Sequence, residues 1–215
     1  MTAAPAVEPV LRRDAARNRA KILVAARAVF GESGVDVSVE TIAQRAGVGV
    51  GTLYRRFPTK ELLIGAVVDE VLQGVLSAAD AALAHESPAN GFAEFIRAVG
   101  WLQFEHAGCL TRLWNSSTGD LRDEIETAIR ALLSRAQSEG AVRRDLVYED
   151  VIVLFWSLRG VIEATATVSP EGWLRHLDLL LTSLVPTDTH LEHPPLTPEQ
   201  VRRARAAVAL HDHAG

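Results

Sequence analysis

A chain of 215 residues with 48% hydrophobic content can bury a substantial core, which excludes an intrinsically disordered protein. Its single cysteine, Cys109, excludes an internal disulfide framework and indicates a reducing compartment. The net charge of −5 is unevenly distributed, because residues 1–60 hold ten Lys/Arg and five Asp/Glu, whereas residues 61–215 hold twelve and twenty-two. A basic N-terminal part suggests an anionic partner there, although a solvated charged face would give the same bias.

Apolar residues recur at helical spacing along the whole chain, and no convincing alternating strands are found, so the predicted fold class is all-α. Residues 1–14 lack the apolar stretch of a signal peptide. No later segment offers about 18 uncharged apolar residues in a row. We therefore expect a soluble, cytoplasmic protein that does not span a membrane.

Periodicity, caps and breakers predict the helices in chain order. Residues 1–11, rich in alanine and proline, are expected to form a mobile arm. The predicted helices cover residues 12–32, 39–46, 50–57, 60–84, 92–113, 121–140, 148–168, 170–185 and 198–210. Ser38 and Gly47 are the expected caps of the second helix. Thr197 to Gln200 have the pattern of a capping box for the last one.

Residues 39–57 have the composition of two short helices that cross steeply around a tight turn. Gly47 permits the positive φ that such a turn needs, and Ala43 is small where the helices come closest. Apolar residues are expected to lock the helices together at Ile42, Ala46, Val48, Leu53 and Phe57. This spacing is typical of a helix-turn-helix, whose second helix presents its polar face to the major groove.

The exposed face carries residue types that bind phosphates and base edges. The predicted donors are Ser38, Thr52, Tyr54, Arg55, Arg56 and Lys60. Gly49 and Gly51 leave room for the backbone to approach a duplex. The alternative is an ordinary pair of surface helices, which the Phe57-Pro58 stop and the following capped helix disfavour.

Three strings, NRAKILVAARAVFGESG, SVETIAQRAGV and GTLYRRFPTKELL, resemble the DNA-binding domain of the TetR family of transcriptional regulators. The resemblance implies that Thr52, Tyr54 and Lys60 contact phosphates, and that Val50, Gly51 and Arg55 lie nearest the bases. Gly49 departs from the family pattern, because many members have a polar residue there that caps the recognition helix.

The resemblance also implies the domain organisation. After the arm at residues 1–11, a three-helix domain with the helix-turn-helix is expected at 12–70. A larger helical domain for effector binding and dimerisation follows at 71–186, and a linker with a short C-terminal helix or tail at 187–215. The run GAVRRDLVYEDVIVLFWSLRGVIEA resembles a subgroup of TetR C-terminal domains with a Gly-x-x-Arg-x-Asp turn.

A homodimer is expected, because one recognition helix reads too few base pairs for useful specificity and two-fold symmetry matches a palindrome. By family analogy, the helices at about 148–168 and 170–184 would form a four-helix bundle with their copies. The partners implied are a double-stranded DNA operator and a small-molecule effector.

An aromatic cluster with a few polar groups is the candidate ligand site and would suit an apolar or aromatic molecule. The candidates are Trp101, Phe104, His106, Cys109, Leu110, Trp114, Phe155, Trp156, Arg159 and Glu163. The alternative is that the aromatic residues are plain core. Arg159 and Glu163, one turn apart, are expected first to pair with each other or across a dimer, and only second to hold a ligand's charge.

An enzyme is disfavoured. Cys109 and His106 lack a third orienting group, so a buried free cysteine is the preferred interpretation. Histidines 190, 193, 211 and 213 lie in a linker and a tail, where metal binding would be adventitious. We expect no catalytic residue, metal or cofactor, and a repressor released from a palindromic operator by its effector. The alternative is a ligand-binding or catalytic helical protein with a non-functional DNA-binding part.

Overall fold

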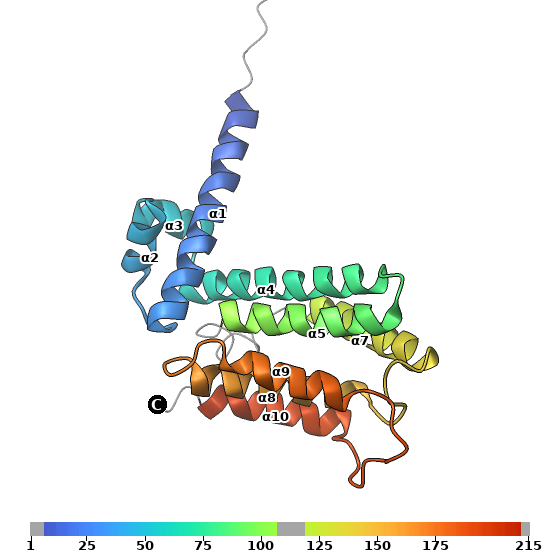
Figure 1. The fold of residues 1–215 in the computed structure, drawn as a ribbon. Coiled ribbons are helices and arrows are strands. Elements are labelled where there is room, and N and C mark those ends of the chain that lie inside the picture. The colour runs from blue at the N-terminus through green and yellow to red at the C-terminus, as the bar shows by residue number, and fades with distance from the viewer. Residues whose placement is uncertain (1–6, 107–118, 212–215) are drawn as a thin grey trace, which may run out of the picture. The chain divides into compact units, whose positions relative to one another are not determined.

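The computed structural model describes residues 7–106 and 119–211, and the surroundings of side chains from 14 to 106 and from 120 to 207. These residues form nine α-helices and no strand (Figure 1), which confirms the predicted all-α class. The chain divides into two compact units, Met1–Val67, here the head, and Val68–Gly215, here the body. The boundary lies inside helix α4 (Lys60–Leu83).

The head is built from three helices and the first turns of α4. These helices are α1 (Val7–Ser33), α2 (Val39–Ala46) and α3 (Val50–Arg56), and each packs on the other two. The side chains at its centre are almost fully excluded from solvent; they are Ile22, Ala26, Phe30, Ile42, Leu53 and Leu63. This apolar core holds the short helices α2 and α3, which are too short to be stable alone.

Helix α1 is longer than the sequence pattern predicted. It begins at Val7, inside the segment expected to be a mobile arm, and ends at Ser33. Pro9 is compatible with this start, because the first turn of a helix contains N–H groups that have no intrahelical partner, and proline simply lacks one. Residues 1–6 of the expected arm lie outside the described residues.

The caps around the turn between α2 and α3 confirm the predicted boundaries. The Ser38 hydroxyl accepts a hydrogen bond from the Thr41 N–H at 3.2 Å. Gly47 adopts φ 65°, and its N–H donates to the Gln44 carbonyl at 3.1 Å. Gly49 precedes α3 without a side-chain cap, so α3 is fixed mainly by its packing on the head.

The body adds five helices to the C-terminal part of α4. They are α5 (Pro88–Glu105), α7 (Gly119–Ser138), α8 (Tyr148–Thr165), α9 (Gly172–Ser183) and α10 (Pro198–His211). Helix α5 packs on α7, α8 and α9, and α8 packs on α9 and α10. Within the body, Figure 1 shows α4 and α5 side by side and α8, α9 and α10 as one group.

Helix α5 begins at Pro88 and not at Phe92, because the predicted turn residues act as a cap. The Ser87 hydroxyl accepts from the Asn90 N–H at 3.4 Å, and Pro88 occupies the first helical position. Gly91 then lies against α4, where a Cβ atom would stand 2.5 Å from the Ala82 carbonyl oxygen. The helix ends at Glu105, earlier than the predicted Leu113, which lies outside the described residues. Helix α8 ends at Thr165 and α9 begins at Gly172, slightly inside their predicted bounds.

A hydrogen-bonded clasp, Arg143 with Asp145, holds the linker that leads to α10. The Arg143 guanidinium donates to the Asp145 carboxylate at 2.6 and 2.8 Å and to the Thr189 carbonyl at 3.0 Å. The same carboxylate accepts from the Leu191 N–H at 3.0 Å. Arg143 and the Leu191 N–H hold the pKa of Asp145 well below its ordinary value.

The predicted capping box of the last helix is confirmed. The Gln200 N–H donates to the Thr197 hydroxyl at 3.2 Å, and the Thr197 N–H donates to the Gln200 side chain at 2.8 Å. Proline at position 198 occupies the first helical position. The clasp and this cap together place α10 against α8 in the body.

In the described part of the chain, α4 is long and apolar enough by length and composition to cross a membrane. A core helix of a soluble protein meets the same test, so the finding is weak evidence of a membrane span. Two acidic residues, Asp69 and Glu70, interrupt its apolar run.

Candidate functional site

Helix α3 buries one side and presents the other to solvent. Leu53 is buried in the head, and Phe57, the residue that ends the helix, is buried beside it. Tyr54 is 44% exposed, and the side chains of Arg55 and Arg56 are exposed as well. A short helix with its apolar side anchored and its aromatic and cationic side free has the form of a recognition helix.

Polar groups on α3 and at the start of α4 are suited to bind an anion on the exposed side of α3. The Arg55 guanidinium donates to the Thr52 hydroxyl at 3.2 Å, which holds that side chain along the helix. At the start of α4, the Thr59 hydroxyl accepts from the Leu62 N–H at 3.3 Å. Lys60 follows it and is partly exposed. Its cationic side chain and the positive end of the helix both favour a phosphate there.

Gly49 and Gly51 have no role in the packing of the head. A Cβ atom at either position would meet no heavy atom within 4 Å. Gly49 has φ −70°, which any residue adopts. Neither space nor backbone conformation in the chain itself requires glycine at these two positions. Close approach of a DNA duplex to the backbone at Gly49 and Gly51 stays a prediction from the sequence.

The structure places all eight residues predicted to bind DNA in the head, and each is partly or fully exposed. Ser38 lies before α2 and Lys60 begins α4. The rest lie on α3, namely Val50, Gly51, Thr52, Tyr54, Arg55 and Arg56. Their contacts with DNA remain predictions.

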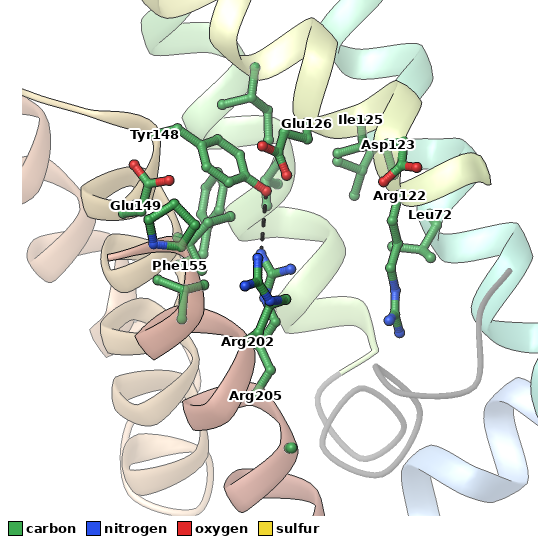
Figure 2. Close-up of a pocket in the computed structure, with 17 residues that line it drawn as sticks. Leu72, Arg122, Asp123, Ile125, Glu126, Tyr148, Glu149, Phe155, Arg202 and Arg205 are labelled. Atoms are coloured by element: carbon green, nitrogen blue, oxygen red, sulfur yellow. Dashed lines mark hydrogen bonds between the residues drawn. The ribbon is translucent and has the colours of Figure 1, made fainter. Parts of the chain in front are cut away.

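The body contains a cavity of about 490 Å³ between α4, α5, α7, α8 and α10. Its apolar lining comes from all five helices and includes Leu72, Val75, Val99, Ile125, Ile129, Ile152, Phe155 and Val201. The size and the mainly apolar walls are those of a small-molecule site. Figure 2 shows α10 along one side of this cavity, with Arg202 and Arg205 on it.

Arg122, Tyr148 and Arg205 bring hydrogen-bond donors to the lining. The Arg205 guanidinium donates to the Tyr148 hydroxyl at 3.3 Å, the contact drawn as a dashed line in Figure 2. Nε and Nη2 of Arg122, and Nε of Arg205, are buried and make no hydrogen bond within the described residues. Burial and the neighbouring charge of Arg205 lower the pKa of Arg122, and burial raises the pKa of Tyr148.

The acidic groups of the lining, unlike Arg122 and Arg205, are either paired with an arginine or exposed to solvent. Glu126 and Glu149 both pair with Arg130, at 2.8 and 3.0 Å. The Arg130 guanidinium also lies 4.4 Å from the centre of the Tyr148 ring. Asp123 is exposed to solvent. Arg202, the third arginine of the lining, pairs with Glu199 on its own helix.

Among the candidate ligand residues, Phe155 lines this cavity. Trp101 and Phe104 instead pack with Trp173, at ring-centre distances of 5.1 and 5.6 Å, beside α9. His106 is buried at the end of α5. These three candidates, together with the other described ones, do not border the cavity of Figure 2.

Arg159 and Glu163 form an ion pair at 3.3 Å, the structural role that sequence reasoning preferred. Cys109, Leu110 and Trp114 lie outside the described residues. Sequence reasoning missed Arg122, Tyr148 and Arg205, because α7, α8 and α10 bring them together only in the folded body.

Comparison with known proteins gives two family matches. Residues 22–67 match the model of the bacterial regulatory proteins of the tetR family. Residues 87–186 match the model of the SbtR-like transcriptional regulator C-terminal domain. The two matches cover most of the head and most of the body.

Two solved structures of similar fold match this chain over nearly their whole length. A TetR transcriptional regulator from Streptomyces coelicolor is 34% identical, with 79% of this chain and 99% of that chain covered and a TM-score of 0.57. A TetR transcription regulatory protein from Mycobacterium vanbaalenii is 29% identical, with 81% and 99% covered and a TM-score of 0.60.

A curated relative matches over a shorter part of the chain. An HTH-type transcriptional regulator from Staphylococcus aureus is 41% identical over 63 residues, which are 29% of this chain and 34% of that protein. The chain therefore matches about a third of the length of this curated relative.

Proposed function

This chain belongs to the TetR family of transcriptional regulators, and from that premise we propose that it is a DNA-binding repressor. Two copies bind a palindromic operator through their heads, and a small molecule in the body cavity releases them. The observation that carries the proposal is α3, which is anchored by Leu53 and presents Tyr54, Arg55 and Arg56 to solvent.

Exposed apolar side chains on α8 and α9 support a dimer. Val153 on α8 and Leu179 on α9 are exposed, and α8 and α9 pack on each other. Apolar residues gathered on adjacent helices favour association with a second copy. A two-fold pair of heads would match half-sites separated by one or more helical turns of DNA.

The proposed coupling runs through α4. Leu72 and Val75 line the cavity, and the first turns of the same helix belong to the head. A ligand that favours one arrangement of α4 would change the population of heads spaced for the operator. One protein of the same fold, 22% identical, has been solved with its ligand resorcinol, so this fold can hold a small molecule.

Selection of binding sites from a random duplex pool tests the proposal. The expected result is enrichment of a palindrome with half-sites spaced by whole helical turns. An Arg55→Ala, Arg56→Ala double variant should enrich nothing, while Arg144→Ala, which removes an exposed arginine of the body, should enrich the same palindrome. If the wild-type chain enriched no sequence, the head would be non-functional and the regulator proposal would be wrong.

A further inference from the structure

The cavity in the body holds two cations with unused hydrogen-bonding capacity. Arg122 comes from α7 and Arg205 from α10, and neither forms an ion pair within the described residues. Buried N–H groups of both make no hydrogen bond there. Because a buried charged donor without an acceptor is costly, such groups in a cavity favour an anionic ligand.

The other charges of the lining do not satisfy these two arginines. Glu126 and Glu149 are occupied by Arg130, and Asp123 is exposed to solvent. Arg202 already has Glu199. An anion entering the cavity would therefore meet Arg122 and Arg205 as the cations free to bind it, with the Tyr148 hydroxyl as a third donor.

The carboxylates of the lining limit the charge of that anion. Three carboxylates, Asp123, Glu126 and Glu149, also line the cavity, so a doubly charged group would meet repulsion that a single charge would meet less. The remaining walls are aliphatic side chains and Phe155. A singly charged head on an apolar body fits both parts of the lining.

We propose that the effector of this chain is an apolar carboxylate, bound by Arg122 and Arg205, with Tyr148 donating a further hydrogen bond. The proposal rests on the effector site of the proposed function and specifies its ligand class. Because Arg122 belongs to α7 and Arg205 to α10, the carboxylate lies between two like charges on different helices, reduces their repulsion and links α10 to α7.

Calorimetric titration of the full chain without DNA tests the ligand class. The probes are 4-phenylbutyrate and its neutral amide, which share one apolar body, and octyl phosphate. The acid is expected to bind at least about tenfold more tightly than the amide, because hydrogen bonds from charged donors to a carboxylate are stronger than those to a neutral group. Equal affinity for acid and amide, tighter binding of octyl phosphate, or no binding of the acid would each overturn the proposal.

Variants locate the carboxylate. Arg122→Gln and Arg205→Gln should each lower affinity for the acid by about tenfold and leave affinity for the amide nearly unchanged. Arg202→Gln is the matched control, since it removes a lining arginine of the same helix that already has an ion pair. An equal loss in Arg202→Gln would mean that general positive charge, and not this site, attracts the acid.

Thermal unfolding of the ligand-free chain provides a readout that depends on no probe. Arg122→Met should unfold at a higher temperature than the wild type, because it removes an unpaired charge with two buried, unbonded nitrogens and keeps an apolar stem of similar length. A lower unfolding temperature would show that Arg122 has a structural partner and would overturn the proposal.

Hydrogen exchange of residues 198–207 tests the fastening of α10. Exchange should slow when 4-phenylbutyrate is added to the wild type and should not change in Arg205→Gln; unchanged exchange in the saturated wild type would overturn this step. None of these measurements uses DNA. If the chain binds the acid but no duplex, the proposed ligand class stands and the proposed DNA-binding function is wrong. If it binds a duplex but not the acid, the DNA-binding function stands and the proposed ligand class is wrong.

Discussion

At Gly51, in the first turn of α3, a substitution is expected to affect DNA binding without disturbing the fold. The chain itself has space for a side chain there. Gly51→Ala should therefore leave the free energy of unfolding unchanged or raise it by up to about 1 kcal/mol, because alanine is the better helix former. Operator affinity should fall by about tenfold, since the added methyl group would stand between the backbone and the duplex.

Gly31→Ala is the matched control for that prediction. Gly31 also lies in a helix of the head, its Cβ would also meet nothing within 4 Å, and it belongs to no predicted DNA contact. The two variants should have similar unfolding temperatures and different operator affinities. Equal operator affinities would show that α3 does not bring its backbone close to DNA.

Ser38 combines a cap with a predicted phosphate contact, and two substitutions separate these roles. Ser38→Ala removes the acceptor for the Thr41 N–H and should lower the free energy of unfolding by about 1 kcal/mol. Ser38→Asp restores the cap but places a negative charge against a phosphate, so it should keep stability and weaken operator binding more than alanine does. Denaturant unfolding and fluorescence anisotropy measure the two effects. Tight operator binding by Ser38→Asp would contradict a phosphate contact here.

Among the elements, the clasp of Arg143 and Asp145 should make the docking of the linker sensitive to acid. The pKa of Asp145 is depressed in the folded chain, so its contribution to stability is present above its ordinary pKa of 3.8 and is lost as the pH falls through and below that value. Asp145→Asn should unfold at a lower temperature than the wild type at pH 7, and the difference should shrink between pH 5 and pH 3. Thermal unfolding across this range measures it; a difference independent of pH would mean that the carboxylate charge does not hold the linker.

Local signals predicted the elements well where caps and breakers are specific. Ser38, Gly47 and the Thr197 capping box lie at the predicted ends of their helices because each supplies its own hydrogen bond or φ angle. The start of α5 was misplaced because Ser87-Pro88 is equally typical of a turn and of a helix N-terminus. The exposed side of α3 was predicted for the same reason as its buried side, since both follow from 3.6-residue periodicity.

The cavity could not be predicted in this way. Arg122 and Arg205 are each ordinary charged residues of amphipathic helices in the sequence, and only the packing of α7 and α10 in the body puts both in the lining of one cavity. The aromatic residues near the end of α5 gave a stronger local pattern, yet Trp101 and Phe104 pack with Trp173. The sequence pattern therefore identified apolar side chains, but it did not predict which helices leave a cavity between them.

For the whole molecule, the proposed dimer predicts a specific loss of association. Leu179 on α9 is 57% exposed, and Leu179→Arg should convert a dimer into a folded monomer by placing a charge in an apolar interface. Leu191→Arg, at a leucine of the linker with 51% exposure, should remain dimeric. Sedimentation velocity measures both, with helical content as the check on folding. A dimeric Leu179→Arg variant would place the interface elsewhere.

The claim that this chain binds DNA as a dimer is tested most directly by the salt dependence of operator affinity in the wild type and in Lys60→Gln. Each phosphate contact contributes about −0.9 to the slope of log affinity against log salt. Because a two-fold dimer presents Lys60 twice, we predict that Lys60→Gln makes the slope shallower by about 1.8. A slope near zero in the wild type, or the same slope in both proteins, would contradict phosphate binding by this head.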